Sequence, residues 1–186
     1  NKQLNLIGMK TNLNYDMFVP TRTLFGAGTL NELHAQPMPG RKALLVISNG
    51  RSTRANSYLS RTEEQLRMAG VETVLFDRVE ANPLKSTVMA GGAMARENGC
   101  DMIVALGGGS VMDAAKAIAV VASNGGDYWD YIPCGTGKGK AVAETPLPIV
   151  AITTTAGTGS ETDAGCVITN AETHEKTGFV RSEERR

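Results

Sequence analysis

Three consecutive glycines, Gly107, Gly108 and Gly109, stand between an apolar run and a segment of helical spacing that begins at Ser110. Glycine permits positive φ and lets a ligand lie against the main chain. A helix that starts there offers unpaired N–H groups and the positive end of its dipole. We call residues 107–110 the glycine loop, and its pattern predicts a site for an anion such as a pyrophosphate. The alternative is a turn that only lets strand and helix pack closely.

The residues after the glycines fit a helix start but not the familiar phosphate motifs. Ser110 is a suitable N-cap, and Asp113 would complete an acidic variant of the capping box. A G-x-G-x-x-G pattern would need a glycine at Val111 or Met112, and no Walker pattern is present. The string CGTGKGK, residues 134–140, fails the Walker test too, and we interpret it as an exposed basic loop.

A second loop groups hydroxyl side chains after another apolar run. It has the sequence TTTAGTGSE, residues 153–161, and we call it the threonine loop. Its threonines could bond the phosphates or the base edge of a nucleotide, or they could cap the next turn. The residues alone leave both interpretations open.

The elements that position these loops alternate along the chain. Apolar runs predict strands at residues 42–48, 71–77, 101–106 and 147–153, and helical spacing predicts helices at residues 56–70, at 82–99 and from 110 onward. A strand pair and then a helix near Thr29 are expected before them. Strands that are apolar throughout and alternate with helices indicate a parallel sheet with helices on both faces. The glycine and threonine loops follow the third and fourth of these strands, and both should face the crevice beyond the carboxyl ends of the strands.

Composition favours a small-molecule ligand. The chain has 186 residues, enough for one domain, with 19 basic and 19 acidic side chains and no long single-sign run. We therefore expect neither a nucleic acid nor a membrane as partner. Three cysteines without a C-x-x-C pair suggest no disulfide framework or zinc ribbon. No apolar run approaches the roughly 18 residues of a spanning helix, and we expect a cytoplasmic protein.

Together, GGGSVMDAAKAIA and TTTAGTGSE followed by CVIT closely resemble the iron-dependent (group III) alcohol dehydrogenases. FGAGTLNEL at residues 25–33 and GDYWDYI at residues 126–132 are similar to that family too. The similarity covers residues 15–179 and corresponds to the amino-terminal half of a typical member. It implies a Rossmann-like α/β domain of the dehydroquinate-synthase-like type that binds NAD or NADP for reversible alcohol/aldehyde interconversion.

The resemblance also implies roles for particular residues. Gly107, Gly108, Gly109 and Ser110 would hold the pyrophosphate with Asp113 beside it, Thr154, Thr155 and Thr158 would line the adenosine side, and Lys176 would lie near the nicotinamide ribose. Lys176 could instead be a solvated hairpin lysine. We expect a polar leader at residues 1–14, the dinucleotide-binding domain at residues 15–180 and a charged tail at residues 181–186.

Cofactor choice depends on the turn after the first predicted strand. NAD-preferring members of the family place an Asp there, which would repel a 2′-phosphate. This chain has Ser48 and Asn49 at that place, with Arg51 and Arg54 close behind. The turn therefore permits NADP as well as NAD. An exposed basic turn without a role in binding is the alternative.

The metal chemistry of the family has no counterpart in these motifs. Its members hold a divalent metal, iron or zinc, with one Asp and three His of a helical carboxyl-terminal domain. This chain has only His34 and His174, and neither lies in a matching motif. We therefore assign no catalytic or metal-binding residue, and we expect a truncated chain that lacks the helical domain, binds cofactor and is inactive alone.

Two other functions stay open at this point. One is a relative of glycerol dehydrogenase or dehydroquinate synthase, which share the glycine loop, although the extra hydroxyls of the threonine loop speak against it. The other is a non-catalytic nucleotide-binding module. A small alcohol or aldehyde would be the substrate of the leading interpretation, and a homo-oligomer is possible.

Overall fold

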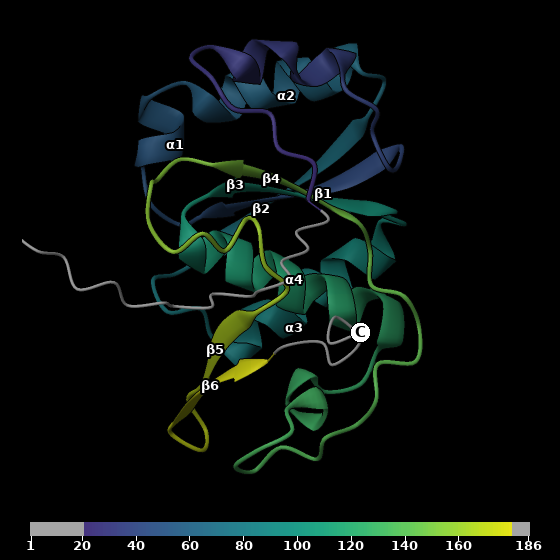
Figure 1. Cartoon of the computed structure of the whole chain (residues 1–186). Coiled ribbons are helices and arrows are strands. Elements are labelled where there is room, and N and C mark those ends of the chain that lie inside the picture. Colours follow the sequence, from purple (N-terminus) through teal and green to yellow (C-terminus); the bar gives the residue numbers. More distant parts are fainter. Residues whose placement is uncertain (1–20, 180–186) are drawn as a thin grey trace, which may run out of the picture.

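A four-stranded parallel sheet is the centre of the molecule. The computed structural model describes residues 21–179. The strands are β1 (Lys42–Ser48), β2 (Glu72–Val79), β3 (Met102–Gly107) and β4 (Ile149–Thr153), in the order β2-β1-β3-β4. Helices lie above and below this sheet in Figure 1, which confirms the predicted α/β class. The polar leader, the charged tail and the part of the predicted strand pair before residue 21 lie outside the described residues, and the described part, residues 21–28, contains no strand.

The central strands differ from the edge strands in burial. All six residues of β3 and the inner five of β1 are buried. In β4, by contrast, Ile149, Ala151 and Thr153 are exposed. The prediction of strands that are buried on both faces is therefore correct for β1 and β3. It is wrong for β4, because alternate side chains of this edge strand are exposed.

One face of the sheet is covered by η1 (Thr29–Ala35), α1 (Ser52–Ala55) and α2 (Tyr58–Met68) (Figure 1). Leu33, Leu59 and Leu66 pack there on side chains of β1 and β3. The helix expected near Thr29 is a 3-10 helix. The single helix expected at residues 56–70 is wrong at its start, because Ser57 has a φ of 58° and separates α1 from α2.

The other face carries α3 (Lys85–Glu97) and α4 (Gly109–Asn124). Gly91 and Gly92 lie within α3, although glycine disfavours a helix. Packing between α3 and α4 explains why these two positions are glycine. A Cβ on Gly91 would lie 2.5 Å from Cδ1 of Ile118, and one on Gly92 would lie 3.1 Å from Cβ of Val121. The glycines thus let α3 and α4 approach closely.

An antiparallel hairpin of β5 (Cys166–Asn170) and β6 (Glu175–Phe179) lies beyond α3 and α4 (Figure 1). Together with η2 (Tyr128–Tyr131) it buries the second side of α4, and therefore α4 is apolar almost all round. The Tyr128 hydroxyl lies 3.2 Å from Sγ of Cys166, and burial raises the pKa of this thiol to about 11. His174 takes φ 57° in the hairpin turn, as expected of a turn residue.

Candidate functional site

The carboxyl ends of β1 and β3 form the switch point of the sheet. From β1 the chain crosses to β2 on one side, whereas β3 lies on the other side of β1. Ligands of open parallel sheets bind at such a point, beyond the strand ends. Ser48 ends β1 and Gly107 ends β3. The fold therefore brings the turn at Ser48 and Asn49 next to the glycine loop.

The helix after the glycine loop begins one residue earlier than predicted. Its N-cap is Gly108, with φ −94° and ψ −167°, and no side chain caps it. Ser110 is already helical, so its assignment as N-cap and the capping box with Asp113 are wrong. Among the described residues, none accepts a hydrogen bond from the N–H of Gly109 or Ser110. These groups at the positive end of a 16-residue helix suit an anion.

The three glycines are required by contacts within the protein. A Cβ on Gly107 would lie 2.6 Å from Cγ2 of Val111, and one on Gly108 would lie 3.0 Å from Oγ1 of Thr155. A Cβ on Gly109 would lie 2.9 Å from Oγ1 of Thr158. None of the three has a positive φ, so the expectation that they supply left-handed conformations is wrong. Close packing explains the glycines, and the free N–H groups are the feature that suits a ligand.

The threonine loop lies directly against the glycine loop. Thr153 pairs with Gly107 across β3 and β4, and the N–H of Thr154 donates to the carbonyl of Gly107 at 3.0 Å. The hydroxyl of Thr158 accepts from the N–H of Ser160 at 3.2 Å and so stabilises the loop itself. The exposed hydroxyls of Thr154 and Thr155 have no partner within residues 21–179, which leaves them available to a ligand.

Asp113 has protein donors on both carboxylate oxygens. Ser160 donates its hydroxyl to Oδ1 at 2.6 Å, and the N–H of Val167 donates to Oδ2 at 3.0 Å. One turn later, Lys116 also reaches Ser160, at 2.8 Å. Neither Lys116 nor Ser160 is among the site residues predicted from the sequence. The signal was available, because Asp113 and Lys116 are charged residues three apart in an otherwise apolar helix.

The turn after β1 combines backbone pairing with one ion pair. The N–H of Asn49 donates to the carbonyl of Val79 at 2.9 Å, which ties the turn to β2. Arg54 lies 2.7 Å from Asp77, whereas Arg51 is exposed and pairs with no carboxylate in the described part of the chain. Of the two arginines, Arg51 is therefore the better placed to meet an added phosphate.

Lys176 belongs to the hairpin. It lies in β6 opposite Thr169, and its Nζ donates to Oδ1 of Asn82 at 2.7 Å. Asn82 is in the connection from β2 to α3, with φ 57°. The structure thus ties Lys176 to the connection that follows β2, and no hydrogen bond among residues 21–179 joins its side chain to the glycine or the threonine loop.

The basic string at residues 134–140 is an exposed loop, as expected, and it is held by the hairpin. The hydroxyl and N–H of Thr136 and the hydroxyl of Thr173 all donate to Glu175. These hydrogen bonds lower the pKa of Glu175 to about 2. Lys138 pairs with Asp130 at 2.7 Å. The loop therefore has structural partners rather than the geometry of a phosphate site.

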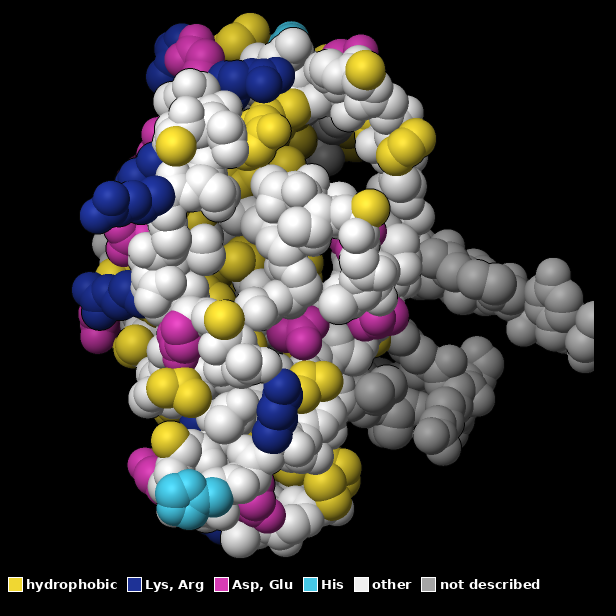
Figure 2. Space-filling model, turned by 90° about the vertical axis from the view of Figure 1, so that its left-hand side faces the viewer, with side chains coloured by type: hydrophobic (Ala, Val, Ile, Leu, Met, Phe, Trp, Pro, Cys, Tyr) yellow, Lys and Arg dark blue, Asp and Glu magenta, His cyan; other side chains and the backbone are white. Residues whose placement is uncertain are grey.

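Figure 2 looks onto the side of the molecule where the strands end. Hydrophobic atoms, uncharged polar side chains and backbone cover much of this face, Asp and Glu side chains lie in a row across its middle, and most Lys and Arg side chains gather along one border. The uncharged areas suit the rings and riboses of a dinucleotide and the cations at the border suit its phosphates, whereas the acidic side chains in the middle disfavour an anion.

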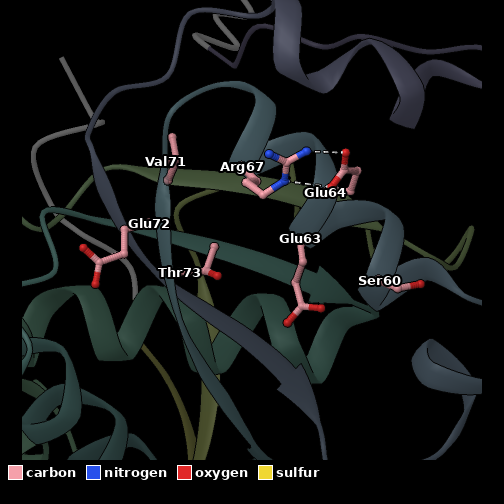
Figure 3. Close-up of a pocket in the computed structure, with 7 residues that line it drawn as sticks. All are labelled: Ser60, Glu63, Glu64, Arg67, Val71, Glu72 and Thr73. Carbon is pink, nitrogen blue, oxygen red and sulfur yellow. Dashed lines mark hydrogen bonds and ion pairs between the residues drawn. The ribbon is translucent and has the colours of Figure 1, made fainter.

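A hollow between α2 and β2 is a different kind of feature (Figure 3). Glu63 and Glu64 line it from α2, and Glu72 and Thr73 line it from the start of β2. Arg67 is occupied by Glu64 at 2.7 Å. The hollow is acidic and lies at the amino ends of the strands, opposite the glycine loop. It therefore does not match an anionic cofactor.

Metal ligands do not gather in the described structure. Within residues 21–179 no group of three or more His, Cys, Asp or Glu side chains is arranged to hold a metal ion. His34 lies in η1, where its Nδ1 is 2.7 Å from Oε1 of Gln65, and His174 lies in the hairpin turn. The same residues include no helix that is long and apolar enough to cross a membrane.

Known proteins share this sequence and fold. A family model for iron-containing alcohol dehydrogenase matches residues 20–185. The 1,3-propanediol dehydrogenase of Klebsiella pneumoniae is 39% identical over 165 residues, which cover 87% of this chain and 41% of that protein. An archaeal alcohol dehydrogenase from a Red Sea brine pool superposes with a TM-score of 0.82 at 39% identity, covering 90% of this chain and 43% of the other. The NADH-dependent butanol dehydrogenase A of Thermotoga maritima gives a TM-score of 0.80 at 33% identity, covering 91% and 42%.

These matches agree with the motifs that the fold brings together. They confirm the resemblance drawn from the glycine and threonine loops, and both loops lie within the matched residues. The chain spans about two fifths of the length of these relatives. The sequence match and the shared fold establish that the chain belongs to the iron-containing alcohol dehydrogenase family.

Proposed function

We propose that this chain is the NAD(P)-binding part of an alcohol dehydrogenase that interconverts alcohols and aldehydes by hydride transfer. The observation that carries the proposal is the pair of free N–H groups of Gly109 and Ser110 at the start of α4, next to the threonine loop. The names of relatives support the cofactor and the substrate class, since one is an NADH-dependent butanol dehydrogenase and another a 1,3-propanediol dehydrogenase.

The residues fit a dinucleotide in a definite order. The N–H groups of Gly109 and Ser110 would receive the pyrophosphate, and the exposed hydroxyls of Thr154 and Thr155 would bond the adenosine side. Ser48 and Asn49, at the end of the adjacent strand, would meet the adenosine ribose. When bound, the dinucleotide supplies the hydride acceptor or donor, and this chain holds and orients it.

A metal has no fitting donor set in the described residues, and we assign it no step here. The contribution that we propose for this chain is therefore cofactor binding. Substrate polarisation would belong to other residues of a whole enzyme. Both NAD and NADP are proposed as ligands, because no carboxylate stands at Ser48 or Asn49 to repel a 2′-phosphate.

A binding titration tests the proposal. We expect nicotinamide fluorescence to report saturable binding of NADH and NADPH to the 186-residue chain. Gly108→Val should weaken binding at least about a hundredfold, because its side chain would enter the space between Thr155 and the helix start and displace the ligand or the loop. Circular dichroism should show that the variant keeps its helices.

The matched control is Glu63→Gln in the hollow beside α2, which removes one charge on the opposite edge of the sheet. It should bind NADH as tightly as the original chain. Equal affinity of Gly108→Val and the original chain would reject the glycine loop as the site. Absence of saturable binding by the original chain would reject the proposed function.

A further inference from the structure

A partly buried polar network joins α4 to the threonine loop. It consists of Asp113 and Lys116 on the helix and Ser160 in the loop, and we call these three residues the clamp. The side chain of Lys116 is 14% exposed, and Ser160 is 4% exposed. Charged groups are seldom placed among buried apolar residues unless their hydrogen bonds are satisfied. The low exposure of Lys116 and Ser160 therefore indicates that the hydrogen bonds of the clamp have a specific structural role.

The ammonium group of Lys116 donates hydrogen bonds to three acceptors in one segment of the chain. Its Nζ donates to the hydroxyl of Ser160 at 2.8 Å, to Oδ1 of Asp163 at 2.8 Å and to the carbonyl of Gly165 at 2.7 Å. An ammonium group has three protons, so all of its donors are used. The three acceptors lie within six residues of sequence. One side chain thus fixes the path of the chain from the threonine loop to β5.

Asp113 completes the attachment from the same side of the helix. Ser160 accepts from Lys116 and donates to Asp113 at 2.6 Å, so its hydroxyl connects the two charges. The second carboxylate oxygen accepts from the N–H of Val167 at 3.0 Å. Both ends of the segment between Ser160 and Val167 are therefore tied to α4, within one turn of each other on the helix.

The segment needs such an attachment because regular structure does not hold it. Between the end of β4 at Thr153 and the start of β5 at Cys166 there is neither helix nor strand. Ordering each residue of such a segment costs roughly 1–2 kcal/mol of conformational entropy. Thr155 and Thr158 contact the glycine loop, but their side chains are exposed. The clamp is a partly buried contact that can help to offset this cost.

Charge adds a second argument. Asp113 lies in the second turn of α4, Asp163 pairs with Lys116 at 2.8 Å, and Lys116 is the cation between the two carboxylates. Without that cation both carboxylates would repel an anionic ligand and disfavour its binding. Lys116 thus holds the loop and also balances charge close to the anion site.

We propose that Lys116 and Asp113 are positioning residues, which hold the threonine loop against the glycine loop in the geometry that binds the dinucleotide. This inference rests on the proposed function. Neither side chain needs to touch the cofactor, since the hydrogen bonds of Lys116 and Asp113 end on protein atoms.

The test measures loop order and affinity in the same variants. Lys116→Met keeps the length of the side chain but removes its charge and hydrogen bonds. We expect faster amide hydrogen exchange across residues 154–166 and a Kd for NADH raised about tenfold, the loss typical of removing hydrogen bonds to a charged group. Lys116→Arg should restore much of the affinity. Ser160→Ala should show a smaller change of the same kind, and it carries the test if Lys116→Met does not fold.

Lys85 provides a matched control. Its side chain is 13% exposed and pairs with Asp127 at 3.2 Å and with Glu172 at 2.8 Å, but it contacts no residue of the threonine loop in the described structure. Lys85→Met should lower Tm yet leave loop exchange unchanged and the NADH Kd within about twofold, because it removes an equally buried ion pair elsewhere.

Three results would overturn the inference. Lys116→Met could leave exchange across residues 154–166 unchanged, or it could speed exchange without weakening NADH binding. Lys85→Met could weaken binding as much as Lys116→Met, which would indicate general instability. If the original chain binds neither NADH nor NADPH, the proposed function fails and the inference fails with it, and this result differs from the other three because it appears before any substitution.

Discussion

The two ends of the parallel sheet are held together in different ways. At the amino ends, Lys42 pairs with Glu72 at 2.7 Å, and the carboxylate of Asp101 accepts from the N–H groups of Arg41 and Lys42. At the carboxyl ends, a backbone hydrogen bond and close contacts of glycine backbone with threonine side chains join the loops. Ion pairs occur on both sides, since Arg54 pairs with Asp77 and Lys116 with Asp163 on the carboxyl side, but the close packing of glycine against threonine joins the loops only at the carboxyl ends.

The comparison shows that a hollow and a charged surface do not by themselves mark the functional end. The hollow beside α2 and β2 lies at the amino ends, where its carboxylates would repel a phosphate (Figure 3). The site that we propose lies at the carboxyl ends, where N–H groups and uncharged hydroxyls without a partner in residues 21–179 are available to a ligand. Parallel strands align the helix starts at that end, and the alignment concentrates positive dipole ends there.

The largest expected effect on folding is at the carboxyl end. Gly107→Ala places a Cβ 2.6 Å from Cγ2 and 2.8 Å from Cβ of Val111. Overpacking of this kind should lower the free energy of unfolding by about 1–3 kcal/mol in urea denaturation. The double variant Gly107→Ala/Val111→Ala should recover part of the loss that the two single variants predict together, because the clash is with Val111.

Glu72→Ala at the amino end is the counterpart of that change. It removes one partner of an exposed ion pair and should change stability little. If Glu72→Ala destabilised the chain as much as Gly107→Ala, the contrast between the two ends would be wrong.

A smaller effect is expected on the preference of the carboxyl end for NADPH or NADH. Ser48→Asp places a carboxylate where the adenosine ribose is proposed to lie, and it should weaken NADPH binding about tenfold more than NADH binding. Ser48→Asn has nearly the same shape without the charge and should leave the ratio of the two Kd values unchanged. Equal weakening of both cofactors by Ser48→Asp would discard the assignment.

The smallest effect concerns acid stability at the amino end. Burial alone would raise the pKa of Asp101, but N–H donors from Lys42 and Arg41 outweigh it and lower this pKa below the usual 3.8. The stabilisation is therefore complete above pH 3.8 and is lost as pH falls through the lower folded pKa. Asp101→Asn should be less stable at neutral pH and should lose less stability on acidification, measured by urea denaturation at pH 6 and below. Parallel acid loss in both proteins would contradict this.

Much of the fold follows from local sequence. The apolar runs that form β1 and β3 predict their burial, because a strand covered on both faces must be apolar on both. The helix boundaries are less accurate, since Ser57 and Gly108 adopt backbone conformations that the spacing of apolar residues does not reveal. The exposed β4 has an apolar sequence too, and nothing in its residues distinguishes it from a central strand.

The candidate site is likewise predictable from the sequence only in part. The motifs place the glycine and threonine loops at the carboxyl ends of two strands, and the structure shows that these strands are neighbours and that the loops are in contact. The charge of Lys116 in an apolar helix is visible in the sequence, but its partners are not, because they lie between 44 and 49 residues away along the chain. The partners of Lys176 and Arg54 could not be predicted for the same reason.

The sequence by itself determined the parallel α/β fold, the order of its elements and the two loops that suit a dinucleotide, because these follow from periodicity, glycine content and motif. Only the tertiary structure decided that the glycines make room for Val111 and the threonines, and that Asp113 bonds the loop rather than capping its own helix. The physical reason is that a side chain bonds the partner that packing brings within reach, and packing joins residues that are distant in sequence.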